Sequence, residues 1–305
     1  MRAIAGCRFQ CRGFPMTRRR FLATAAGGLA TPGLLSAAEE KPSGWQIGCW
    51  TRPWDKHEYR VALDAIAQAG FRHAGLMTAK GKNNLVISTA TTLEEAQEVG
   101  EEVKKRGLSV PGVYAGGFPL GEPGVVALKR LIDCCVAATS KSLMVGGTGD
   151  AKTNDAYYKT IAEACPYAAE KGIEIVLKPH GGLNATGPQC RKCIEAVGHK
   201  SFRLWYDPGN IYYYSNGELD PTKDAATVDG LVSGVCIKDY RHPKNVAVTP
   251  GTGQVDFKAV LAALKKGGFT SGPLVIETLA PGELPALLTE ARQARKFVDD
   301  LVGQV

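Results

Sequence analysis

The chain of 305 residues lacks a Gly-x-Gly-x-x-Gly motif after its first predicted strand, and it lacks a long hydrophobic run. The missing glycine motif excludes the usual fingerprint of a dinucleotide-binding protein. The apolar stretch at residues 23–35 is too short and too rich in glycine and alanine for a membrane span. No linker or low-complexity segment interrupts residues 39–305, so we predict a single domain there.

Little net charge remains once the N-terminal segment is set apart. Six of the 37 basic residues lie in residues 1–38, which contain no acidic residue. The rest of the chain therefore has 31 basic and 30 acidic side chains, a net charge of +1. This balance does not provide the basic surface that nucleic-acid binding requires, so we predict no nucleic-acid partner.

The basic residues of the N-terminal segment follow the pattern of an export signal. Residues 17–22, Thr-Arg-Arg-Arg-Phe-Leu, resemble a twin-arginine motif, and a small-residue cleavage site follows at residues 36–38. We expect residues 1–38 to be a leader that starts at Met1 or Met16. The mature part, 39–305, is then periplasmic and has no stable membrane span. A disordered N-terminal arm is the alternative.

Two of the nine cysteines, Cys7 and Cys11, belong to the predicted leader. The other seven cannot all pair with one another, because their number is odd. Cys190 and Cys193 have the spacing of a redox or zinc motif, but no second such pair accompanies them and they lie in a predicted helix. We interpret them as apolar positions that face the core.

Strand-like runs alternate with helix-like runs between residues 45 and 302. The predicted strands are 45–51, 71–77, 108–114, 142–146, 173–179, 202–207, 234–239 and 273–277. The predicted helices are 59–69, 93–106, 125–138, 155–171, 189–197, 225–231, 257–266 and 285–302. Thr92 and Glu95 have the spacing of a capping box at the second helix. Eight alternating units with short apolar strands predict an α/β protein, a single (β/α)8 TIM barrel.

Ionisable side chains stand at the ends of three predicted strands. Lys178 and His180 end the fifth strand, Asp207 ends the sixth and Glu277 ends the eighth. Residues two apart on a strand share a face, so Lys178 and His180 should both face the barrel interior or its mouth. Active sites of such barrels lie at the C-terminal ends of the strands. Because buried charges are costly unless they are paired or used, this convergence predicts an active site.

Five short motifs make the sequence resemble the sugar-phosphate isomerase/epimerase superfamily, the xylose isomerase-like barrels. In chain order they are Lys-Pro-His-Gly-Gly (178–182), Tyr-Asp-Pro-Gly-Asn (206–210), Ile-Lys-Asp (237–239), Gly-Thr-Gly-Gln-Val-Asp-Phe (251–257) and Val-Ile-Glu (275–277). The resemblance implies a divalent metal held by Glu, Asp, His and Glu from strands five to eight. Asp207 and Glu277 match two of these ligands. Lys178 stands at the position of the first Glu, and Cys236 stands at that of the His.

These two substitutions leave three arrangements of the site open. In the first, His180, Asp207 and Glu277 hold Mn²⁺, Mg²⁺, Zn²⁺ or Fe²⁺, together with water or Cys236. In the second, the Lys178 ammonium group replaces the metal and polarises a substrate oxygen. In the third, Lys178 is a reactive amine with a lowered pKa. An inert network of ion pairs is the alternative without catalysis.

The resemblance implies an isomerase or epimerase that acts on a carbohydrate or an oxidised sugar derivative. We expect catalysis by His180, Lys178 and Glu277. His180 or Glu277 removes a proton, and the metal or Lys178 stabilises the negative charge that develops. The alternatives are a lyase or hydratase that uses Lys178 and His180, a hydrolase that uses Asp207 and Glu277, and a carbohydrate-binding barrel without catalysis or metal.

Further side chains near the strand ends are predicted to bind the substrate: Trp50, Trp54, Asn210, Lys238 and His242. The two tryptophans follow the first strand, where their rings could stack on a sugar. The tyrosine run at residues 212–214 predicts either a wall of the site or a subunit contact in a homo-oligomer.

Overall fold

The computed structural model describes residues 44–81 and 83–305, so the predicted leader lies outside the described residues. Parallel strands alternate with helices along this range. The strands are β1 (Trp45–Trp50), β2 (His73–Gly75), β3 (Val113–Tyr114), β4 (Ser142–Val145), β5 (Glu174–Leu177), β6 (Phe202–Tyr206), β7 (Val232–Ile237) and β8 (Gly272–Ile276).

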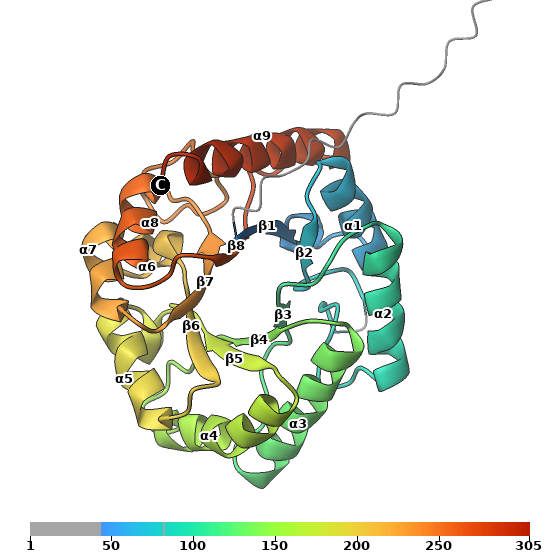
Figure 1. Ribbon diagram of the computed structural model, residues 1–305, viewed down its shortest axis with the longest axis vertical. Coiled ribbons are helices and arrows are strands. Elements are labelled where there is room, and N and C mark those ends of the chain that lie inside the picture. Colours follow the sequence, from blue (N-terminus) through green and yellow to red (C-terminus); the bar gives the residue numbers. More distant parts are fainter. Residues whose placement is uncertain (1–43, 82) are drawn as a thin grey trace, which may run out of the picture. The chain divides into compact units, whose positions relative to one another are not determined.

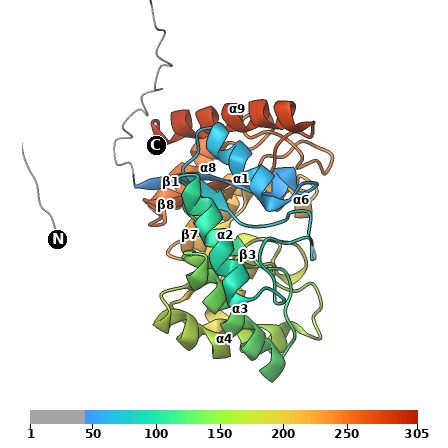
Figure 2. The ribbon, with the colours of Figure 1, turned by 90° about the vertical axis from the view of Figure 1, so that its right-hand side faces the viewer.

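Helices surround the strands, as Figure 1 shows. The α-helices are α1 (Tyr59–Gln68), α2 (Leu93–Lys105), α3 (Glu122–Ala137), α4 (Asn154–Glu170), α5 (Gly187–Val197), α6 (Pro208–Tyr214), α7 (Pro221–Ala225), α8 (Phe257–Lys266) and α9 (Leu284–Val302). The 3-10 helices are η1 (Arg52–Trp54), η2 (Gly182–Asn184) and η3 (Ala226–Val228). In the side view of Figure 2, α9 lies next to α1, and it also packs on β1.

The strands form one eight-stranded sheet in the order β2-β1-β8-β7-β6-β5-β4-β3. Isolated parallel bridges from His73 to Ser109 and from Leu76 to Val113 join the two edges. Pro111 lies between these bridges and has no backbone N–H to donate, which interrupts the ladder. For this reason β2 and β3 are shorter than predicted. The sheet is nevertheless a nearly closed parallel barrel, and the predicted TIM-barrel fold is confirmed.

Side chains inside the barrel form a cluster that is separate from the core between the strands and the helices. The interior cluster consists of Trp50, Met77, Met144, Val176, Trp205, Cys236 and Val275. The ring centroids of Trp50 and Trp205 are 5.7 Å apart. Along β7, Cys236 belongs to this cluster while Val235 and Ile237 belong to the outer core, the alternation expected of a strand. The filled interior leaves the ends of the barrel as the places where a ligand can bind.

Local capping signals decide where several helices begin. Thr92 and Glu95 form the predicted capping box at α2. Helix α6 is absent from the predicted elements, although its start carries a clear signal. The Asp207 carboxylate accepts a hydrogen bond from the Asn210 backbone N–H at 2.9 Å, and Pro208 occupies the first helical position. A similar Asp-Pro pair starts α7 earlier than the predicted helix 225–231.

The seven cysteines of the described residues are free and buried. The thiols of Cys190 and Cys193 on α5 lie near the backbone carbonyl oxygens of Asn184 and Leu183. Burial raises the pKa of both thiols, so they are protonated. The two cysteines are therefore packed against the core, in agreement with the sequence interpretation.

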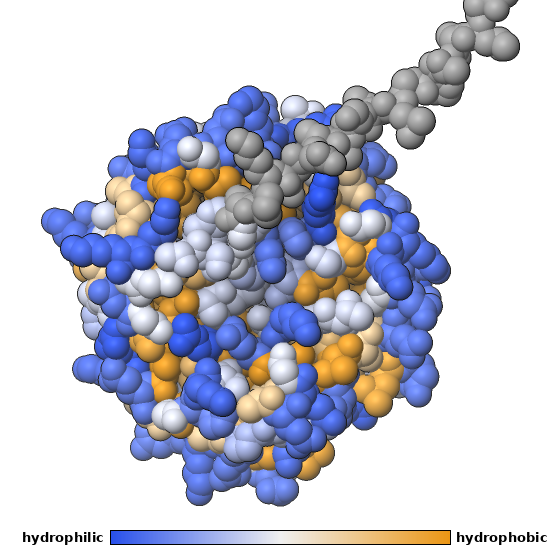
Figure 3. Space-filling view, in the orientation of Figure 1, coloured by the Kyte–Doolittle hydropathy of each residue, from blue (hydrophilic) through white to orange (hydrophobic). Residues whose placement is uncertain are grey.

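The face of the molecule seen in Figure 3 carries mostly hydrophilic side chains along its outer rim, where the helices lie. In residues 44–81 and 83–305, every helix is too short or too polar to span a membrane.

We expect Gly234→Ala to lower the free energy of unfolding by about 1–3 kcal/mol, the usual effect of overpacking. A Cβ atom at this position of β7 would lie 2.5 Å from the Trp205 ring, inside the filled barrel. Equilibrium denaturation measures the effect. Gly117→Ala is a matched control, because a Cβ atom there meets nothing within 4 Å. We expect the control to stay within about 0.5 kcal/mol of wild type. Equal losses in both variants would contradict the packing described here.

Candidate active site

Four charged side chains meet at one end of the barrel. Lys178, Asp207, Lys238 and Glu277 are the residues that immediately follow β5, β6, β7 and β8. Each is at most 2% exposed. Because the four strands are neighbours in the sheet and end at the same level, their next residues form one layer across the mouth. The structure brings together Lys178, Asp207 and Glu277, three of the four residues predicted to converge, and adds Lys238, which was predicted to bind the substrate.

The two lysines bridge the two carboxylates. Lys178 Nζ lies 2.5 Å from Glu277 Oε2 and 3.1 Å from Asp207 Oδ2. Lys238 Nζ lies 2.7 Å from Glu277 Oε1 and 3.0 Å from Asp207 Oδ2. Arg52 on η1 adds a third cation, with Nη1 at 2.5 Å from Glu277 Oε1. Three cations thus surround two carboxylates, which leaves one positive charge in excess. These five residues are called the charged cluster below.

Two asparagines hold the charged cluster in place. Asn210 on α6 accepts a hydrogen bond from Lys238 Nζ at 3.1 Å and donates one to the carbonyl oxygen of Pro179 at 2.6 Å. Asn184 on η2 donates to the carbonyl oxygens of Gly146 at 3.0 Å and Lys178 at 2.9 Å. These bonds tie the ends of β4, β5 and α6 together, so the lysines have fixed positions.

The charges within the cluster keep Lys178 protonated and Glu277 ionised. Burial opposes the charged form of Lys178, but the charges of Glu277 and Asp207 outweigh it and raise the pKa of this amine. Burial likewise opposes ionisation of Glu277, yet Lys178, Lys238 and Arg52 hold the pKa of its carboxyl group well below the ordinary value. A neutral, nucleophilic Lys178 amine is therefore not favoured.

His180 lies at the mouth, two residues beyond Lys178. Its ring centroid is 5.8 Å from that of Tyr214 on α6. Desolvation of the ring, together with the positive charges of Lys178 and Lys238, lowers the pKa of the imidazole to about 4. The residue is exposed to solvent, which screens part of this effect. The direction of the shift keeps the ring neutral at pH 7, with a lone pair that can accept a proton.

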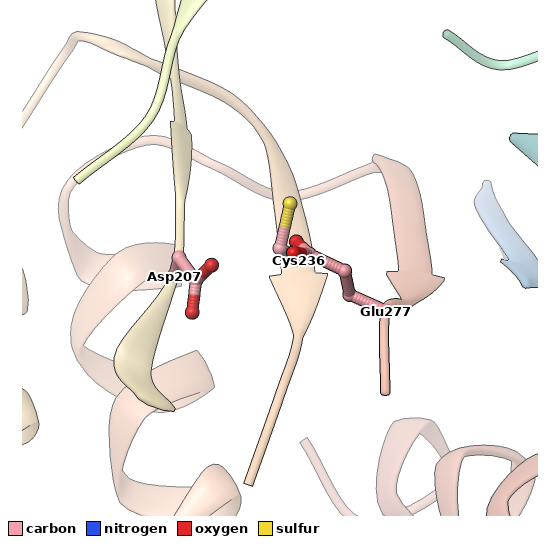
Figure 4. Close-up of side chains that lie close together, drawn as sticks. All are labelled: Asp207, Cys236 and Glu277. Carbon is pink, nitrogen blue, oxygen red and sulfur yellow. The ribbon is translucent and has the colours of Figure 1, made fainter. Parts of the chain in front are cut away.

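Asp207, Cys236 and Glu277 form a possible metal-binding group. One donor atom of each lies within 4.8 Å of the others. In Figure 4 the three side chains lie close together, and that of Glu277 extends toward Cys236. Within the described residues, His180 does not belong to this group, although the sequence predicts it as a ligand. Burial also raises the pKa of the Cys236 thiol well above its ordinary value, so the thiol is protonated.

The lysines of the charged cluster act against a divalent ion at this position. At ~4 Å and an effective dielectric constant of ~20, two unit charges interact by about 4 kcal/mol, so each ammonium group would repel a divalent ion by roughly twice that. A protonated lysine also offers no lone pair to a metal. With Lys178 and Lys238 where the structure places them, the side chains present do not fit a bound divalent metal.

A cavity of about 250 Å³ lies beside the charged cluster. Arg52 and Glu277 form part of its wall, together with His57 and Val246. A molecule bound there would touch Arg52 and Glu277, whereas Lys178 and His180 are not among the residues that line it. A larger cavity of about 700 Å³ lies between α4 and α5, and no residue of the charged cluster lines it. Of these two cavities, only the smaller is lined by residues of the charged cluster.

The structure separates the residues predicted to bind the substrate into two groups. Lys238 and Asn210 lie in the charged cluster or next to it. Trp50 and Trp54 are 0% and 1% exposed, because one packs inside the barrel and the other in the outer core. Neither ring offers an open face for stacking. His242 lies beside the Tyr240 hydroxyl, and in the described part of the chain no contact joins it to the charged cluster.

Sequence reasoning missed the role of Arg52, which is not among the predicted site residues. Its signal is its position, because it follows β1 closely, as the other charged residues follow their strands. The neighbouring Asp239 has partners outside the charged cluster. Its carboxylate accepts hydrogen bonds from backbone N–H groups of the loop after β7, including those of Gly251 at 3.0 Å and Gly253 at 2.8 Å.

The chain is similar to several known proteins. The inosose dehydratase of Salmonella agona (strain SL483) is 23% identical over 248 residues, which cover 68% of this chain and 81% of that protein. A solved structure of L-ribulose 3-epimerase has 17% identity and a TM-score of 0.65, and the match covers 85% of this chain and 95% of that one. D-allulose 3-epimerase from Methylomonas sp. has 18% identity and a TM-score of 0.65, over 85% of this chain and 99% of that one.

The residues that match a protein family are largely those that form the barrel. The model of the family described as "Xylose isomerase-like TIM barrel" matches residues 63–301, a range that includes β2 to β8 and four of the five charged-cluster residues. This match spans most of the sequence, and the chain belongs to the xylose isomerase-like TIM barrel family.

Proposed function

We propose that the protein is a sugar-modifying enzyme that removes a proton from carbon in a carbohydrate or an oxidised sugar derivative. The observation that carries the proposal is the buried charged cluster at the strand ends, with the neutral His180 beside it. Strongly perturbed ionisable groups in a cleft are typical of catalytic sites. The relatives named as sugar epimerases and an inosose dehydratase support a carbohydrate as the substrate class.

His180 is the proposed base. Its neutral imidazole accepts the proton as the C–H bond next to a carbonyl group breaks. The electron pair of that bond forms a carbon–carbon double bond, and the carbonyl pair moves onto oxygen. The cations of the charged cluster stabilise the resulting enediolate oxygen. Return of the proton from His180 to the former carbonyl carbon, as the hydroxyl proton of the enediolate passes from one oxygen to the other, gives an isomer. An epimer requires a second proton donor on the opposite face. Transfer of the His180 proton to a departing β-hydroxyl group releases water and gives dehydration.

Glu277 is a weaker candidate for the base, although the sequence suggests it as one of two. Three cations lower the pKa of its carboxyl group, so it holds a proton poorly. The same argument disfavours a hydrolase that uses Asp207 and Glu277. Such an enzyme needs one of its two carboxyl groups protonated at working pH, whereas both carboxylates here share Lys178 and Lys238.

Proton abstraction does not require the divalent metal that the sequence predicts. Asp207 and Glu277 would have to supply that metal site, and both already bind lysine.

Export to the periplasm by the twin-arginine route stays part of the proposal. It favours an unphosphorylated sugar, because sugar phosphates are scarce outside the cytoplasm. A homo-oligomer is also proposed. In the single chain, Tyr214 borders His180, which accounts for part of the tyrosine run.

Deuterium exchange tests the function without knowledge of the product. We expect at least one member of a panel of D-allulose, L-ribulose, D-fructose, inososes and ketone-bearing sugars to gain one mass unit when incubated with the protein in D₂O. Carbon-bound hydrogen exchanges only if the proton is removed and returned. Mass spectrometry gives the rate, and calorimetry gives the binding affinity for each sugar. Tight binding of a panel sugar without exchange would instead support the non-catalytic binding protein.

We expect His180→Ala to slow this exchange by ~10²–10⁴-fold, the usual contribution of a general base. His199→Ala is the matched control. The His199 ring contacts the Ser201 backbone N–H at the opposite end of β6, far along the strand from the mouth. A rate near that of wild type in the His180 variant would remove this residue from the mechanism.

The pH dependence should reflect the lowered pKa of His180. A base works in its neutral form, so kcat/KM should persist as the pH falls through 6.5 and decline only at lower pH, towards 4. The same shift means that the unfolded chain binds this proton first, so stability is complete above pH 6.5 and decreases towards pH 4. A rate–pH profile recorded beside circular dichroism separates the two effects. An acid limb at pH 6.5 or higher would contradict the assignment.

A further inference from the structure

We propose that this site works without a divalent metal, and that the Lys178 ammonium group takes the metal's place in polarising the substrate oxygen. The inference rests on the proposed proton abstraction for its catalytic part. Its first test measures metal binding and therefore stands apart from any activity.

Each carboxylate oxygen of Asp207 and Glu277 already has a hydrogen-bond or ion-pair partner. Asp207 Oδ1 caps α6, and Oδ2 faces both Lys178 and Lys238. Glu277 Oε1 faces Lys238 and Arg52, and Oε2 faces Lys178 at 2.5 Å. A metal ligated by these oxygens would lie against the ammonium groups of Lys178 and Lys238 or would have to displace one of them. A displaced lysine would then lie unpaired in the barrel mouth, which is costly.

The charge balance of the site points the same way. The resemblance implies a ligand set of Glu, Asp, neutral His and Glu, with a charge of −3 that a divalent ion largely neutralises. With Lys178 and the protonated Cys236, the same four positions sum to −1. Lys238 brings the sum to zero, and Arg52 makes it positive. The site therefore has no net negative charge that would attract a divalent ion.

Hydrogen-bond donors separate the roles of the two lysines. A lysine ammonium group has three N–H donors. Lys238 faces three acceptors, on Asp207, Glu277 and Asn210. Among the described residues Lys178 faces two acceptors, on Asp207 and Glu277. Lys178 donates a hydrogen bond to Glu277 and keeps at least one N–H for a substrate oxygen, whereas Lys238 donates to both Asp207 and Asn210.

This arrangement also restricts the substrate class. A metal can chelate two adjacent hydroxyl or carbonyl oxygens, whereas an ammonium group acts as a point charge on one oxygen. The site therefore suits a sugar that already carries a ketone, whose C–H bond is acidified by a single polarised carbonyl oxygen. Arg52, with further N–H groups at the wall of the cavity, can contact a second oxygen of the same molecule.

Metal analysis of the full-length wild-type protein is the first test. We expect protein purified without chelator to contain far less than one Mn, Mg, Fe or Zn ion per chain. Calorimetric titration with Mn²⁺ should give no binding heat, and the unfolding midpoint should be the same in Mn²⁺ and in EDTA. One tightly held ion per chain, whose removal lowers the unfolding midpoint, would overturn the proposal.

Restoring the implied ligands gives the converse test. The double variant Lys178→Glu/Cys236→His supplies the carboxylate and imidazole that wild type lacks. We expect it to bind Mn²⁺ by titration and to unfold at a higher temperature with Mn²⁺ than with EDTA. Lys178→Gln is the matched control, because it removes the cation without adding a carboxylate. A folded double variant that ignores Mn²⁺ would show that Lys178 and Cys236 do not decide metal binding. If it does not fold, the wild-type titration decides.

Deuterium exchange tests the catalytic part. We expect EDTA to leave the wild-type rate unchanged and Lys178→Met to slow exchange by ~10²–10³-fold, the usual effect of removing one oxyanion donor. Lys258→Met, on the exposed face of α8, is the control. Loss of wild-type exchange in EDTA, restored by Mn²⁺, would overturn the inference and leave the proposed function intact. Absence of exchange with every sugar would instead count against the function, while the metal titrations would still stand.

Discussion

The carboxylates of Asp207 and Glu277 can remain ionised inside the barrel because two lysine ammonium groups lie between them. All four groups are at most 2% exposed. Burial of that many charges is stable only when each has partners at hydrogen-bond distance. The requirement constrains the strands beneath, since the four residues have to follow β5 to β8 at the same level. The filled interior below excludes water and strengthens these interactions.

Several local features serve the same end. The carboxylate of Asp207 starts α6, and α6 carries Asn210, which binds the lysine from β7. The aspartate thus neutralises Lys238 and also places a second acceptor for it. On the other side, Asn184 fixes the chain just after β4 and β5 through two backbone carbonyl oxygens. A site built in this way is rigid before a substrate arrives, which favours catalysis by preorganised charge.

The chain belongs to the xylose isomerase-like family, yet its site differs from the ligand set that the resemblance implies. Two substitutions, Lys178 and Cys236, change a cluster that would attract a divalent ion into one that carries its own cations. The fold does not determine the chemistry, because the residues after the strands can change while the barrel remains the same. We therefore base the proposed mechanism on the contacts of these side chains.

The sequence alone was sufficient to predict the barrel fold. The alternation of strand-like and helix-like runs and the capping box at Thr92 are signals that act over a few residues. It also located Lys178, Asp207 and Glu277, because each ends a strand that local patterns define. Helix α6 could have been found from its Asp-Pro start, which is a local signal too.

Only the tertiary structure decided which groups pair and which rings are accessible. Lys178 and Glu277 are 99 residues apart along the chain, and Arg52 and Glu277 are 225 apart. Their contacts depend on closure of the sheet and on the reach of long side chains, which no local pattern encodes. The alternation of side chains along β1 predicts that Trp50 faces the inside of the barrel. Whether that side is an open mouth or a filled interior depends on Trp205, a residue from the other half of the barrel.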